Sequence, residues 1–170
     1  MADRMADRMA DRMVDPAGLA RKLGVTPDCS IWLLDVPAPS TALLRSVCPP
    51  DVTLVEAHMS ETEADESDNG HERFDLIFLW PQRLDGLTER LAALQWRIVP
   101  SGAIWLMLPK KAVARRRRIA FSWEEMQAAA LQTDLVDNKV ATFSEEEYGT
   151  RFVLRRDRRQ LYTAPDDASR

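Results

Sequence analysis

Residues 30–40 have the sequence SIWLLDVPAPS, an apolar run followed by an acid and then by a turn with two prolines. The run at 31–34 has no polar interruption, which is typical of a strand buried on both faces of a parallel sheet. We predict further strands at 52–56, 74–80 and 103–108, with helical patterns between them. Strands that alternate with helices indicate an α/β fold with a largely parallel sheet.

The second half of the chain predicts how this sheet ends. Leucines at helical spacing predict an amphipathic helix over residues 83–98. Ser122 and Glu125 form the sequence pattern of a capping box, which begins another helix. Two strands, at 139–143 and 150–155, then follow as an antiparallel pair.

A helix followed by two final strands resembles the class I S-adenosylmethionine-dependent methyltransferase fold, a Rossmann-like sheet whose last strand returns antiparallel. The gap between residues 56 and 74 is too short for the third strand of that fold and its helices. We therefore expect the sheet order 2-1-4-5-7-6, with the third strand missing or vestigial. The chain is also similar to an uncharacterised bacterial family, a domain of unknown function, in LARKLGV (19–25), GAIWLMLPKK (102–111), LVDNKV (135–140) and YGTRFV (148–153). That resemblance implies the same methyltransferase-like fold and no particular substrate.

The turn after the first predicted strand departs from the methyltransferase pattern. In that fold the turn is rich in glycine, so that bare backbone approaches the cofactor and offers free N–H groups. Here Pro37 and Pro39 occupy the first two glycine positions, and proline has no N–H to donate. Asp35 aligns with the acid that opens the motif, and Glu56 aligns with the acid that would hold ribose hydroxyls. The motif that orients a target amine is reduced to Trp-Pro-Gln at 80–82.

These departures lead us to expect a non-catalytic binding or regulatory domain with a degenerate cofactor site, and therefore no cofactor. One alternative is a divergent S-adenosylmethionine-dependent methyltransferase whose cofactor sits against Glu56 without a glycine loop. The other is a structural or assembly protein. Asp35 and Glu56 are ligand-binding candidates, or else solvated strand ends.

A basic segment follows the strand predicted at 103–108. Ligands of open α/β sheets bind beyond the carboxyl ends of the strands, so this segment is expected at the mouth of the fold. Arginine can grip a phosphate or carboxylate with two parallel hydrogen bonds. We expect a site here for an anionic ligand, a nucleic-acid backbone or an acidic protein; the alternatives are a solvated loop or pairing with the acidic stretch at 61–68. The cations concerned are Lys110, Lys111, Arg115, Arg116, Arg117 and Arg118.

Four polar residues of the last two predicted strands are further ligand-binding candidates. They are Asn138, Lys139, Tyr148 and Arg151. These side chains either face a pocket or cap the edge of the sheet.

Composition and charge limit which other kinds of protein this chain can be. The net charge of −4 does not suggest a general nucleic-acid binder. No apolar run approaches the length that crosses a membrane and no secretory signal is visible, so we expect a cytoplasmic protein without a membrane partner. Cys29 and Cys48 have no metal-ligand spacing and are expected to be reduced, and we predict no metal site. We expect a disordered Met-Ala-Asp-Arg repeat leader at 1–14, one domain at 15–156 and a polar tail at 157–170.

Overall fold

The computed structural model describes residues 15–58 and 72–163. The predicted leader, the acidic stretch at 61–68 and the last residues of the predicted tail lie outside these ranges. None of the described helices is both long and apolar enough to cross a membrane. Both cysteines are free; burial raises the pKa of the Cys29 thiol to about 11, so this group stays protonated at neutral pH.

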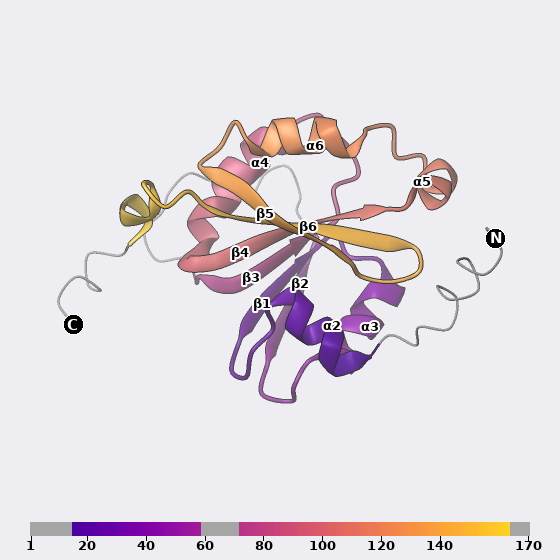
Figure 1. Cartoon of the computed structure of the whole chain (residues 1–170), viewed down its shortest axis with the longest axis horizontal. Helices are drawn as coiled ribbons and strands as arrows, with labels where there is room; N and C mark the ends of the chain where they lie inside the picture. Colours follow the sequence, from indigo (N-terminus) through magenta and orange to yellow (C-terminus); the bar gives the residue numbers. More distant parts are fainter. Residues whose placement is uncertain (1–14, 59–71, 164–170) are drawn as a thin grey trace, which may run out of the picture.

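Six strands form one sheet in the order β2-β1-β3-β4-β6-β5 (Figure 1). They are β1 (Ser30–Leu34), β2 (Thr53–Ala57), β3 (Phe74–Leu79), β4 (Ile98–Pro109), β5 (Leu135–Thr142) and β6 (Glu147–Leu154). The first four strands pair in parallel, and β6 runs antiparallel to both of its neighbours. This arrangement confirms the predicted fold class and the predicted strand order. Strand β2 forms one edge of the described sheet, and the third strand of the methyltransferase fold is absent beside it.

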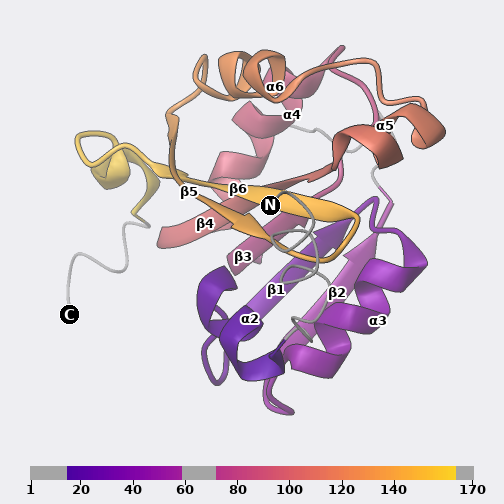
Figure 2. The ribbon, with the colours of Figure 1, turned by 45° about the vertical axis from the view of Figure 1, so that its right-hand side comes forward.

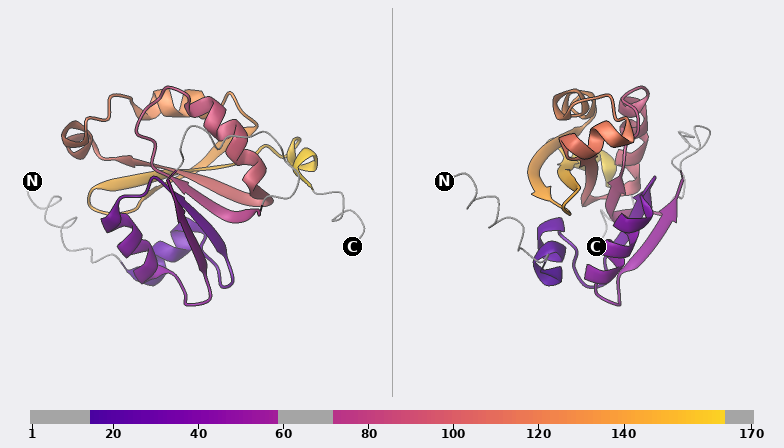
Figure 3. Two further views of the ribbon diagram at one scale, coloured as in Figure 1. Left: turned by 180° about the vertical axis from the view of Figure 1, so that it is seen from behind. Right: turned by 90° about the vertical axis from the view of Figure 1, so that its right-hand side faces the viewer.

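Helices cover both faces of the sheet (Figures 1 and 3). The α-helices are α2 (Pro16–Leu23), α3 (Ala38–Val47), α4 (Leu87–Leu94), α5 (Lys111–Arg117) and α6 (Trp123–Ala130), and the short 3-10 helices are η1 (Gln95–Arg97) and η2 (Arg159–Tyr162). Buried side chains of α2 and α3 pack with one face of the sheet, and those of α4 and α6 pack with the other. The sheet therefore separates two hydrophobic cores.

Local chemistry explains several helix ends. The capping box at the start of α6 is present: the Glu125 amide donates to the Ser122 hydroxyl at 3.1 Å, and the Ser122 amide donates to the Glu125 carboxylate at 2.7 Å. Helix α4 is shorter than the predicted helix at 83–98, because Gly86 has a φ of 75° and the chain tightens into η1 after Leu94. The arginine-rich segment is a helix, α5, rather than only a loop.

The packed structure also extends beyond the predicted boundary at residue 156. Tyr162 in η2 is buried, and its hydroxyl donates to the Asp134 carboxylate at 2.6 Å. Its backbone carbonyl accepts a hydrogen bond from Arg73. One aromatic side chain therefore anchors part of the segment that we expected to be a polar tail.

Candidate functional site

The carboxyl ends of β1 and β3 mark the point where a ligand is expected in this fold. The helix after β1, α3, and the helix after β3, α4, pack on opposite faces of the sheet. Where crossover helices diverge in this way, the ends of the two strands leave room for a ligand. Asp35 follows β1 and Trp80 follows β3, and the Trp80 amide donates to the Leu34 carbonyl at 3.1 Å.

The two acids predicted at this edge both have cationic partners. Arg90 of α4 donates to Asp35 at 2.8 Å, and the Asp35 backbone has a left-handed φ of 55°. Glu56, at the end of β2, accepts a hydrogen bond from Arg45 of α3 at 2.8 Å. The Arg45–Glu56 pair is exposed on both sides, so it contributes little stability and leaves the carboxylate accessible.

The turn between β1 and α3 does not suit a cofactor held by free backbone amides. Pro37 is the N-cap of α3 and Pro39 lies in its first turn, and neither has an N–H group. The Asp35 amide is already bonded to the Ala57 carbonyl at 3.2 Å, and the Ser40 amide is bonded to the Pro37 carbonyl at 3.0 Å. The turn therefore offers a ligand fewer free amides than a glycine-rich turn would, which increases the importance of side chains at this edge.

A buried carboxylate joins three segments at the same edge. Glu147, the first residue of β6, is 1% exposed. Its carboxylate accepts hydrogen bonds from the Trp80 indole at 2.9 Å, from the Arg117 guanidinium at 2.8 Å, and from the Ser40 hydroxyl. We refer to Ser40, Trp80, Arg117 and Glu147 as the Glu147 cluster. Every polar group in it is satisfied, as buried polar groups require.

Sequence reasoning assigned no function to Ser40 or Glu147. Glu147 is the last of three consecutive glutamates that follow Ser144, which has the pattern of a solvated turn. The available signal was the strand alternation of β6, which places residue 147 on the same face as Gly149 and Val153, toward the core. Trp80 and Trp105 are both buried.

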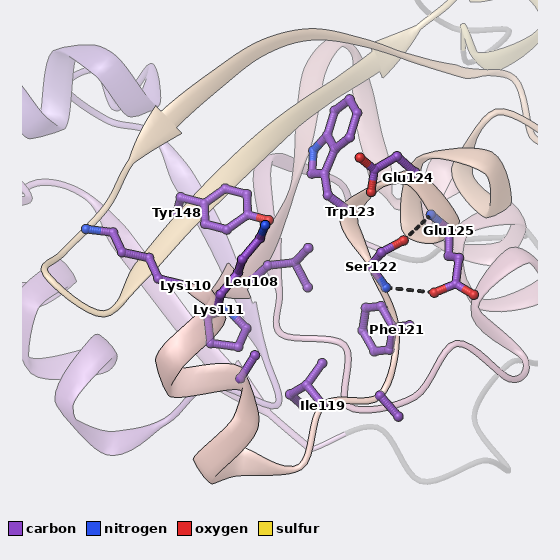
Figure 4. Close-up of a pocket in the computed structure, with 13 residues that line it drawn as sticks. Leu108, Lys110, Lys111, Ile119, Phe121, Ser122, Trp123, Glu124, Glu125 and Tyr148 are labelled. Atoms are coloured by element: carbon purple, nitrogen blue, oxygen red, sulfur yellow. Dashed lines mark hydrogen bonds between the residues drawn. The ribbon is translucent and has the colours of Figure 1, made fainter.

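A cavity of about 760 Å³ lies beside the carboxyl end of β4, on the α6 side of the sheet (Figure 4). This volume is within the usual range for small-molecule sites. The cavity, which we call the aromatic pocket, is lined by Leu108, Lys110, Lys111, Ile119, Phe121, Trp123, Glu124 and Tyr148, among others. Figure 4 shows the rings of Tyr148 and Phe121 on opposite sides of it.

Two of these aromatic side chains are held in defined states. The Trp123 indole donates to the Thr150 hydroxyl at 2.8 Å, which fixes the orientation of the ring. Burial, and to a lesser extent the nearby Glu124 carboxylate, raises the pKa of the Tyr148 phenol. The phenol therefore stays protonated at neutral pH and can donate a hydrogen bond to a ligand.

The basic residues are placed in different surroundings. Arg116 and Arg117 both pair with Glu146, at 3.1 and 3.0 Å, and Arg117 also binds Glu147. Lys110 is the N-cap of α5 and Arg118 its left-handed C-cap, while Arg115 is exposed on the helix. The structure thus brings two of the six cations to the β5–β6 turn and two, Lys110 and Lys111, to the aromatic pocket.

Three other candidates lie away from the carboxyl edge. The Lys139 ammonium donates to the Lys22 carbonyl of α2 at 2.7 Å. Arg151 donates to Asn138 at 3.4 Å, and burial lowers the pKa of its guanidinium. These side chains belong to the middle of the β5–β6 pair, where Lys139 lies opposite Arg151. The structure does not bring them together with Asp35 or Glu56.

No family model and no curated protein matches the chain. Solved structures match its fold. A SAM-dependent methyltransferase from Aquifex aeolicus has a TM-score of 0.60 at 10% identity, over 83% of this chain and 90% of that one. The N-methyltransferase NodS from Bradyrhizobium japonicum, in complex with S-adenosyl-L-homocysteine, has a TM-score of 0.55 at 13% identity, over 86% and 90%. Fibrillarin from Aeropyrum pernix, with natively bound S-adenosyl-L-methionine, has a TM-score of 0.54 at 9% identity, over 80% and 73%. At these identities the likeness establishes a methyltransferase-like Rossmann fold.

The comparisons overturn two of our expectations. The prediction of a non-catalytic domain with a degenerate site is wrong, and so is the prediction of no cofactor, because the matching solved structures include methyltransferases and complexes with S-adenosylmethionine or S-adenosylhomocysteine. The main expectation gave the missing glycine turn more weight than the methyltransferase-like fold. The Glu56 side chain, at the end of β2, is accessible in the structure.

Proposed function

We propose that this chain is an S-adenosylmethionine-dependent methyltransferase that holds its cofactor through side chains at the strand ends. The observation that supports this most directly is the fold, which matches that of a SAM-dependent methyltransferase with a TM-score of 0.60. The cofactor supplies an activated methyl group when it is bound. Glu56 is the residue placed to accept hydrogen bonds from its ribose hydroxyls.

The aromatic pocket is the proposed site of the methyl acceptor. It lies at the end of β4, two strands from β1, which corresponds to about 10 Å at the usual spacing between strands. A cofactor over β1 and β2 and an acceptor in the pocket would therefore meet above β3. The rings of Phe121, Trp123 and Tyr148 suit a flat organic acceptor more than a flexible polar one.

Other parts of the proposal rest on the sequence. We propose that the exposed arginines of α5 bind an anionic ligand or partner, that the protein works in the cytoplasm, and that it belongs to the uncharacterised bacterial family it resembles.

Replacing Arg115 and Arg118 together with Gln should reduce retention on heparin while leaving the Arg117–Glu147 contact intact. Unchanged retention would remove these two residues from the anion site.

Ligand binding to the folded chain provides the central test. S-adenosylhomocysteine at one hundred times its dissociation constant should stabilise the native protein by about 2.7 kcal/mol, measured as a rise in Tm. Glu56→Gln should weaken binding by about tenfold or more, because glutamine has only one acceptor oxygen and lacks the charge that strengthens hydrogen bonds from the ribose hydroxyls. The measurement is isothermal titration calorimetry.

Asp51→Asn is the matched control, since Asp51 is an exposed acid just before β2, at the opposite end of the same strand. It should bind S-adenosylhomocysteine like the wild type. If millimolar S-adenosylmethionine and S-adenosylhomocysteine both leave Tm unchanged, the proposed function is wrong.

A further inference from the structure

The Glu147 carboxylate lies where the sheet would receive a ligand. Its three donors come from segments that directly follow β1, β3 and β4: Ser40 from the first turn of α3, Trp80 from the end of β3, and Arg117 from α5. All three strands point their carboxyl ends to this edge. Figure 2 shows the β5–β6 turn beside α3 at the same end of the sheet. A group of this chain therefore occupies the expected ligand position on the α3 side.

The donors themselves form a receptor for a carboxylate. A hydroxyl, an indole N–H and a guanidinium offer three hydrogen-bond donors and one positive charge. Ser40 is 5% exposed and Trp80 is 2% exposed, so water has little access to either. Such donors need an acceptor, because a buried donor without a partner is costly. Any carboxylate that reached them would gain the same contacts as Glu147.

The connection that holds Glu147 in place is short and lies at the surface. The chain turns between Phe143 and Glu147, where the Phe143 and Ser144 amides both donate to the Glu147 carbonyl at 3.0 Å. The Glu146 side chain, next to it, is exposed and makes surface ion pairs with Arg116 and Arg117, while the Glu146 carbonyl accepts a hydrogen bond from the Lys110 amide at 2.8 Å. Surface pairs of this kind contribute about 0–1 kcal/mol each. The Glu147 backbone is fixed by its pairing with β4, so leaving the receptor requires only rotation of the Glu147 side chain.

We propose that Ser40, Trp80 and Arg117 form a carboxylate-binding site for the amino-acid end of the cofactor, and that Glu147 is an internal competitor for it. This inference rests on the proposed function. A ligand whose carboxylate enters must displace the Glu147 side chain, so its apparent dissociation constant is raised by the inverse of the fraction of molecules in which the site is free. The competitor acts only on ligands that carry the carboxylate.

Two adenosyl compounds separate this competition from general effects on the fold. S-adenosylhomocysteine has the amino-acid carboxylate, whereas 5′-methylthioadenosine keeps the adenosine and thioether and lacks the amino-acid part. Glu147→Gln retains the size of the side chain and removes its charge. It should bind S-adenosylhomocysteine at least about tenfold more tightly than the wild type, with affinity for 5′-methylthioadenosine unchanged. Glu145→Gln, at an exposed position of the same turn, is the matched control and should leave both affinities unchanged.

A second measurement tests the carboxylate receptor without any nucleoside. In Glu147→Ala, acetate should raise Tm by filling the vacated site, whereas chloride at equal ionic strength should not. Wild-type protein should respond equally to both salts. If Glu147→Ala does not fold, the titrations of Glu147→Gln decide the question alone.

The outcomes distinguish the inference from the proposed function. If S-adenosylhomocysteine binds the wild type and Glu147→Gln equally, or if both nucleosides gain affinity together, the competition is refuted while the methyltransferase proposal stands. If neither nucleoside binds any variant, the methyltransferase proposal fails and the cofactor assignment fails with it. A rise in Tm caused by acetate in Glu147→Ala then still supports a carboxylate receptor, and its absence refutes one.

Discussion

Replacing Glu147 with alanine should lower the free energy of unfolding by about 3 kcal/mol. This value is near the lower end of the roughly 3–5 kcal/mol range for breaking a buried ion pair. The value lies at that end because the Arg117 side chain is 31% exposed and keeps its contact with Glu146. Most of the loss comes from the Trp80 indole and the Ser40 hydroxyl, which are left buried without an acceptor. The measurement is urea-induced unfolding of both proteins without added carboxylate.

Glu146→Ala tests whether burial is the cause. Glu146 is the adjacent residue and binds the same arginine, but its side chain is 51% exposed. Its replacement should cost less than about 1 kcal/mol. Equal losses for the two variants would show that the Glu147 cluster contributes no more than a surface ion pair.

Gly102→Ala should be the second strongly destabilising change, at about 1–3 kcal/mol. A Cβ at this position would lie 2.7 Å from the Asp75 carbonyl oxygen and 3.0 Å from the Val99 carbonyl oxygen. Both atoms belong to the backbone, so neither can rotate away as a side chain would. Gly102 also lies where the pairing of β3 with β4 shifts register, between Phe74 and Leu76. Thermal unfolding should show the loss as a lower Tm.

Gly18→Ala is the control for this substitution and should have the opposite sign. Gly18 lies in α2, and a Cβ added there would have as its nearest neighbour a carboxylate oxygen of the exposed Asp15 side chain, at 2.8 Å. That side chain can move aside, and alanine is favoured over glycine in a helix by roughly 0.5–1 kcal/mol. A Tm for Gly102→Ala equal to or above that of Gly18→Ala would contradict the steric argument.

Much of the fold was accessible from the sequence because burial on two faces leaves a strong pattern. The runs at 31–34 and 103–108 became β1 and the core of β4, and the short gap before residue 74 correctly predicted that the described sheet has no strand beyond β2. Helix α5 was missed because the positive charges of KAVARRR led us to interpret the segment as an anion site or a solvated loop. Alanine and arginine are both good helix formers. Tyr162 was missed because a single aromatic residue in a polar segment gives no periodic signal.

The candidate site was less accessible because its contacts are long-range. Ser40 and Glu147 are 107 residues apart in the chain, and no local pattern reports such a pair. Asp35 and Glu56 were found by their places at strand ends, but the arginines that pair with them were not. The lining of the aromatic pocket was predicted only in part: Lys110, Lys111 and Tyr148 were candidates, whereas Phe121 and Trp123 come from the segment that leads into α6.

Strand β6 joins the two halves of the proposed site through adjacent residues. Glu147 points toward the α3 side and Tyr148 toward the aromatic pocket, because neighbouring side chains of a strand alternate between faces. A slip of one residue in the pairing of β6 would exchange them, placing a carboxylate among the aromatic rings and a phenol against Trp80. Because β6 is hydrogen-bonded on both sides, by β4 and β5, that register is held from two directions. A change in the length of the β5–β6 turn that shifts this register would therefore move Glu147 and Tyr148 together. It would alter the aromatic pocket as well as cofactor binding.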